Sequence, residues 1–120
     1  MTNCLIVGLG GFVGAVCRYL IGLLQVSAAG GFPVKTFVIN IVGSFVIGVV
    51  TALGARHNLS PQGILFLKVG FCGGFTTFSS FALENQTLLD KGETGTAVLY
   101  MVLSLLLGIG AVLLGERVAG

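Results

Sequence analysis

Four long apolar stretches constrain this chain more than any other feature of its sequence. They are residues 5–24, 36–55, 63–83 and 94–115. The first is interrupted only by Arg18 and the third only by Lys68, and the other two carry no charge. A transmembrane helix needs about 20 predominantly apolar residues. Only 8% of the chain is charged, against about 25% in soluble domains. We therefore expect an all-α membrane protein in which residues 1–120 form a single domain of four transmembrane helices.

The third stretch contains GFCGGFTTFSSF at residues 70–81, which combines glycines, hydroxyls and phenylalanines without a charge. Glycine is a poor helix former, so the pair Gly73–Gly74 predicts a break in the helix. Counted at about 1.5 Å per residue from Pro61, this pair lies near the bilayer midplane. A helix broken there presents a partly negative carbonyl end and a partly positive amide end. We interpret this stretch as the functional centre.

The first stretch is rich in glycine. A dinucleotide-binding loop is excluded because the first acidic residue of the chain is Glu84, far beyond the position that would bind a ribose. Gly10 and Gly14 instead have the spacing that lets membrane helices approach closely. Arg18 continues the same face. Its side chain either extends to the membrane interface or places a positive charge at the mouth of an anion path.

Two polar side chains lie deep in the other stretches. The amide of Asn40 must find a partner in lipid, and it either bonds to another helix or donates to a permeation path. Tyr100 is too deep for the aromatic belt at the interface, so we expect its hydroxyl to face a polar path. Ser104 lies one turn further on the same face.

Aromatic rings and hydroxyls alternate after the predicted break. Phe78 and Phe81 are three residues apart, so they share a helix face, and Thr77, Ser80 and Glu84 share the next one. The ring edges are positive, and hydroxyls and amides donate hydrogen bonds. Such a wall suits a small, hard anion. The alternative is that both rings serve only in packing.

The charges flanking the four spans are balanced. One side has Arg56, Arg117 and, nearest to it, Lys68, whereas the other has Lys35, Lys91 and, nearest to it, Arg18. Orientation normally follows an excess of Lys and Arg on the cytoplasmic side. With three against three, we expect insertion in both orientations and an antiparallel homodimer with a two-fold axis in the membrane plane.

Three segments resemble the Fluc (CrcB) family of fluoride channels. They are GGFVGAVCRY at 10–19, FVINIVGSFVIG at 37–48 and GFCGGFTTFSSF at 70–81. The resemblance implies a dual-topology homodimer with two antiparallel fluoride pores and a central structural sodium ion. The residues that match the fluoride pathway are Asn40, Phe78 and Phe81, the polar track Ser80, Tyr100 and Ser104, and Arg18 of the first-helix motif. The sodium site matches the backbone carbonyls of Gly73 and Thr76. Phe75 and Ser80 depart from the leucine and threonine that the family often has there, and Gly108 sits where a further serine could extend the polar track.

We expect passive, electrogenic export of fluoride across the bacterial cytoplasmic (inner) membrane. The partners are fluoride, membrane lipid and a second copy of the chain, with no nucleic acid. The spans contain no paired carboxylates, metal cluster or nucleophile with a base, so we expect no enzyme. A proton-coupled exporter of the small multidrug transporter type would need a carboxylate deep in the first helix, which is missing. A non-transporting assembly subunit would not need Asn40, Tyr100 and the hydroxyl cluster.

Overall fold

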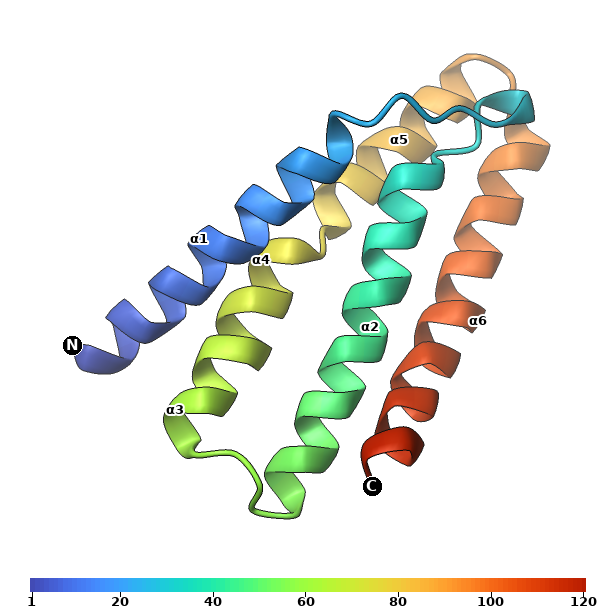
Figure 1. Ribbon diagram of the computed structural model, residues 1–120. Helices are drawn as coiled ribbons and strands as arrows, with labels where there is room; N and C mark the ends of the chain where they lie inside the picture. The colour runs from blue at the N-terminus through green and yellow to red at the C-terminus, as the bar shows by residue number, and fades with distance from the viewer.

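The computed structural model describes residues 1–120, apart from the side chain of Ala29. Four helical segments are long and apolar enough to cross a membrane, which confirms the four expected spans. Three are continuous helices: α1 (Thr2–Gly22), α2 (Val34–Ala55) and α6 (Thr94–Ala119). The third span consists of α3 (Pro61–Ile64), the π-helical η2 (Leu65–Cys72), α4 (Gly73–Phe75) and α5 (Phe78–Asp90), as Figure 1 shows. A single turn, η1 (Ala29–Gly31), lies in the loop after α1.

The third span starts where the sequence provides a cap. The hydroxyl of Ser60 accepts a hydrogen bond from the N–H of Gly63 at 3.0 Å, and Pro61 occupies the first turn, where its missing N–H costs nothing. The backbone then stays helical through α3, η2 and α4 as far as Phe75. Two residues of extended backbone follow before α5 begins. The third span is therefore one helix that is interrupted once.

Glycines let the first span pack closely against the third. A Cβ atom on Gly10 would lie against the carbonyl oxygen of Phe66, and one on Gly14 against the carbonyl oxygen of Phe71. From the opposite side, a Cβ on Gly70 would come within 2.7 Å of the Val7 carbonyl oxygen. The expectation that Gly10 and Gly14 of α1 serve helix packing is confirmed. We call this contact the glycine seam.

The second and the last span form another close pair. Gly48 of α2 lies against the Val112 backbone, and Gly115 of α6 lies against the Phe45 backbone. Small residues at these crossings let the two backbones approach, as is common in membranes. The molecule thus consists of two tightly packed helix pairs, α1 with the third span and α2 with α6 (Figure 1).

One cluster of buried side chains lies where α5 ends and α6 begins. Leu88 of α5 and Ala97 and Tyr100 of α6 are buried together, and Phe32 and Phe81 pack against them. Most other large apolar side chains are exposed on the protomer. This is the pattern expected when lipid or a second protein chain, instead of water, surrounds the helices. The functional groups described below lie between the two helix pairs.

Candidate functional site

The break in the third span is stabilised by a side chain from another helix. Thr76 (φ −82°, ψ 158°) and Thr77 (φ −149°, ψ 117°) are extended. The Oδ1 atom of Asn40 accepts a hydrogen bond from the Thr77 N–H at 2.9 Å, and its Nδ2 donates to the Thr77 carbonyl oxygen at 3.2 Å. The hydroxyl of Thr77 then caps α5 by accepting from the N–H of Ser80 at 3.1 Å. Asn40 therefore replaces the backbone bonds that Thr77 would make inside a continuous helix.

The prediction that the helix breaks at Gly73–Gly74 was wrong by three residues. Both glycines have helical backbone within α4, and α5 begins at Phe78. The reason Gly74 lacks a side chain is contact: a Cβ there would lie 2.5 Å from the Gly11 carbonyl oxygen of the glycine seam. The break occurs instead where Asn40 can satisfy the exposed backbone groups.

Two backbone carbonyls at the break lose their ordinary helical donors. In a continuous helix the Gly73 carbonyl would accept from the Thr77 N–H, which here donates to Asn40. Likewise the Thr76 carbonyl would accept from the Ser80 N–H, which here donates to the Thr77 hydroxyl. Such oxygens need another partner when they are removed from water. The donor set of Gly73 and Thr76 therefore fits a hard monovalent cation.

Arg18 lies at the same break but on the side of α1. Its Nε donates a hydrogen bond to the Gly74 carbonyl oxygen at 3.1 Å, one residue before α4 ends. A cation near the carbonyl end of a helix is stabilising there. Arg18 does not line the groove described next. The hydrogen bond from Arg18 therefore joins α1 to the end of the helix that precedes the break.

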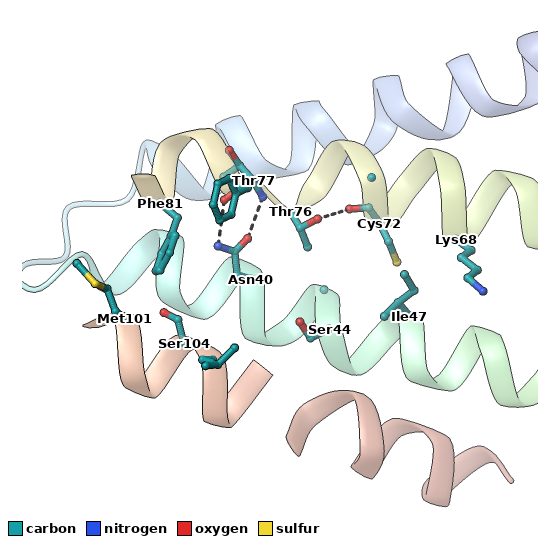
Figure 2. A pocket seen from close by; sticks show the side chains of 14 residues that line it. Asn40, Ser44, Ile47, Lys68, Cys72, Thr76, Thr77, Phe81, Met101 and Ser104 are labelled. Carbon is teal, nitrogen blue, oxygen red and sulfur yellow. Dashed lines mark hydrogen bonds between the residues drawn. The ribbon is translucent and has the colours of Figure 1, made fainter. Parts of the chain in front are cut away.

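A groove of about 660 Å³ runs between the two helix pairs. Figure 2 shows Asn40 and Ser44 of α2 on one wall, Thr76, Thr77 and Phe81 of the third span on another, and Met101 and Ser104 of α6 on a third. Gly43 lets the Thr76 side chain approach α2, because a Cβ would collide with the Thr76 methyl group.

Both predicted phenylalanines line this groove. Their ring centroids are 5.8 Å apart with an interplanar angle of 43°. Phe81 is half-buried and presents an edge-on contact to Tyr100, with centroids 4.9 Å apart. Phe78 is 79% exposed on the single protomer. One ring is therefore fixed by the fold of the chain, whereas the other projects from it.

The predicted polar track is divided by the structure. Ser104 lines the groove, and its buried hydroxyl has no hydrogen-bond partner within the described residues. Ser80 and Tyr100 do not line the groove. Tyr100 is fully buried, and its hydroxyl donates to Oε1 of Glu84 at 2.7 Å. The groove thus unites Asn40, Phe78, Phe81, Ser104, Gly73 and Thr76.

Glu84 is a site residue that the sequence did not single out, although its spacing puts it on the helix face of Thr77 and Ser80. It lies within α5, where Oε2 accepts a 2.6 Å hydrogen bond from the Thr36 hydroxyl in addition to the bond from Tyr100. Glu84 also borders a second cavity of about 510 Å³, together with Pro33 and Lys91. Its place on the face of Thr77 and Ser80 was the available signal. The carboxylate therefore links three spans.

The chain matches a protein-family model and known proteins over most of its length. A family model described as "CrcB-like protein, Camphor Resistance (CrcB)" matches residues 5–116. The fluoride-specific ion channel FluC of Shewanella halifaxensis is 48% identical over 118 residues, which cover 98% of this chain and 95% of that protein. The channel of the same name from Thermus thermophilus is 46% identical over 121 residues, covering 100% and 97%. The one from Chlorobium chlorochromatii is 46% identical over 115 residues, covering 95% and 89%.

Proposed function

The chain belongs to the CrcB family, and from that membership we propose that it is a fluoride-selective ion channel. It is a multi-pass protein of the bacterial inner membrane and not an enzyme. The channel lowers cytoplasmic fluoride by passive, electrogenic export. An inside-negative potential favours the exit of an anion by about 2.3 kcal/mol per charge per 100 mV.

The observation that carries this proposal is the polarity of the groove. Asn40 and Ser104 supply hydrogen-bond donors, and Phe81 supplies a ring that is held in place by Tyr100. An Asn amide has two N–H bonds, and one of those of Asn40 is used on Thr77. The other N–H and the unpartnered Ser104 hydroxyl are suited to replace water around a small anion. No carboxylate is among the residues that line the groove.

We assign the remaining pathway residues by their positions. Phe78 and Phe81 contact the ion through their ring edges, which carry partial positive charge. Ser80 and Tyr100 continue the route beyond Phe81 toward the second cavity. Arg18 contributes positive potential from the opposite side of the break, where its Nε bonds to Gly74.

The functional unit is an antiparallel homodimer. Phe78 projects from the protomer with 79% of its surface exposed, which suits a ring that completes a pore with a second copy. The even charge balance of the spans favours both orientations. Two lysines added at the C-terminus should bias insertion and remove active dimers, and a copy biased the other way should restore them. One-sided labelling of the unmodified protein would contradict dual topology.

A sodium ion is proposed as a structural ion at the dimer axis. The carbonyls of Gly73 and Thr76 would hold it, since their usual helical donors are engaged elsewhere. The ion would supply positive charge where two breaks meet. Exchange of sodium for a large organic cation should weaken the dimer, measured as its dissociation in detergent. An unchanged dimer would remove the ion from the proposal.

The decisive experiment measures ion efflux from liposomes that contain only the purified protein. We expect fluoride efflux that generates a potential and strongly exceeds chloride efflux. Fluoride flux should continue without a proton gradient. An absence of fluoride efflux from well-folded protein would overturn the proposal.

Glu84 favours a second candidate, a proton-coupled exporter. It is a half-buried carboxylate bonded to two hydroxyl donors beside the Phe81 ring contact. Glu84→Gln would abolish proton coupling because an amide does not titrate. If transport requires a proton gradient in the native protein and loses that requirement in Glu84→Gln, the exporter replaces the channel. A channel should remain electrogenic and independent of the gradient in both proteins.

A further inference from the structure

One charged side chain lines the groove, and the pathway described above does not use it. Lys68 of η2 lies at the end of the groove away from Phe81, with Cys72 and Thr76 between them (Figure 2). The other lining side chains are apolar or carry only hydroxyl, amide or thiol groups. The half-buried lysine therefore faces an uncharged cavity that leads to Asn40.

The depth of Lys68 in the membrane requires an explanation. It lies seven residues after Pro61, which corresponds to roughly 10 Å along the helix. Charged groups at such depths are costly in lipid and face a protein interior or a water-filled cavity. A groove of about 660 Å³ with hydroxyl and amide groups on its walls has room for many waters. The groove can therefore accommodate the ammonium group together with water.

We propose that Lys68 attracts anions into the groove toward Asn40 and Ser104 and so raises the rate of fluoride entry. The inference rests on the proposed function. Low-dielectric walls focus the field of a charge and raise the local concentration of counter-ions. Thr76 follows Lys68 by eight residues, or about 12 Å. A unit charge at that distance changes local anion concentration about two- to tenfold for dielectric constants from 80 to 20.

The test compares Lys68→Gln with Arg117→Gln in liposomes. Arg117 is exposed in the last turn of α6, outside the groove, on the membrane side nearest to Lys68. Both changes remove one positive charge from the same side, so they alter the topological charge balance equally. The initial fluoride flux is measured at low fluoride, with impermeant salt setting the ionic strength near 10 mM or near 1 M. The Debye length falls from about 30 Å to about 3 Å over this range.

At low ionic strength Lys68→Gln should reduce the flux about two- to tenfold, whereas Lys68→Arg and Arg117→Gln should retain it. At high ionic strength the flux of Lys68→Gln should equal that of the native protein. Equal losses in the two Gln variants would assign the effect to topology and overturn the inference. So would a native rate in Lys68→Gln at low ionic strength.

A chemical rescue keeps the inference testable if Lys68→Gln folds poorly. Lys68→Cys is made in a chain whose three native cysteines are replaced by alanine. A cationic methanethiosulfonate should restore flux, and an anionic one should lower it further. Labelling by both reagents also shows that the groove is hydrated, even if the protein carries no fluoride. Labelling without any charge-dependent change in an active channel would contradict the steering role.

Discussion

The two faces of the third span differ sharply, although both are rich in small residues. One face carries Gly70 and Gly74, which contact the backbone of α1 so closely that neither can hold a methyl group. The other face carries Gly73, and a Cβ there would meet no atom within 4 Å. The adjacent residues Gly73 and Gly74 thus have opposite surroundings. Gly74 belongs to the glycine seam, whereas Gly73 borders the groove.

This difference separates the part of the protein that fixes the fold from the part that we propose contacts ions. At the seam, backbone atoms pack against backbone atoms, so no flexible side chain can move aside. In the groove, space and polar groups remain available. Asn40 of α2 bonds across the groove to the Thr77 backbone, so it joins the groove to the span that carries the glycine seam.

The largest expected effect is at the seam, in Gly10→Ala. The new methyl group would collide with the Phe66 carbonyl oxygen and lie 3.0 Å from Gly70 Cα. We expect a loss of about 1–3 kcal/mol from overpacking, seen as a lower thermal midpoint in detergent. Gly8→Ala is the matched control, because nothing lies within 4 Å of a Cβ there and the gain in helix propensity is the same. Similar midpoints for the two variants would show that the seam is loose.

The next effect concerns the residue that couples the two regions. Asn40→Leu leaves the N–H and carbonyl of Thr77 without their partners. Because Thr77 is only half-buried and borders the groove, where water can replace part of these bonds, we expect a loss of about 1 kcal/mol in all. The break should rearrange, and fluoride flux should fall to background in liposomes. Thr51→Val, which also removes a polar group from α2 but lies outside the groove, should retain flux. Native flux in Asn40→Leu would mean that the break forms without this clamp.

A smaller effect is expected inside the groove, at the rings. Phe81→Ile removes the ring edge but keeps apolar volume, so fluoride flux should fall at least about tenfold if ring contacts supply a few kcal/mol at the barrier. It also loses the contact with Tyr100, worth about 0.5–1.5 kcal/mol of stability. Phe78→Ile should lower flux with little change in protomer stability, because that ring is exposed. Full flux in folded Phe81→Ile would leave packing as its only role.

The smallest effect on the protomer is expected at Gly73. Gly73→Val adds a side chain where the protomer has open space, so the helix content measured by circular dichroism should be preserved. If two breaks meet at the dimer axis, the added side chain should weaken the dimer and its affinity for sodium. A dimer of native strength would place Gly73 away from the axis.

The sequence by itself determined the four spans, the glycine packing of α1 and the chemistry of the groove. Apolar length is a local property, since each span must satisfy its own backbone in lipid. The spacing of Gly10 and Gly14 likewise predicted a close helix contact, which the structure confirms. Asn40, Phe78, Phe81 and Ser104 stand out in the sequence by their residue type and position, and the structure brings them together in one groove.

Only the tertiary structure decided where the third helix breaks and what surrounds Glu84. The sequence places two glycines before the break, but glycine propensity cannot distinguish a helix interruption from a close helix contact. The break lies at Thr77 because an amide 37 residues earlier in the chain bonds to its backbone. Glu84 likewise acquires its role from the hydroxyls of Thr36 and Tyr100 on two other helices. In lipid, an exposed polar group is stable only where another part of the protein supplies its partner, and that position depends on how the helices pack.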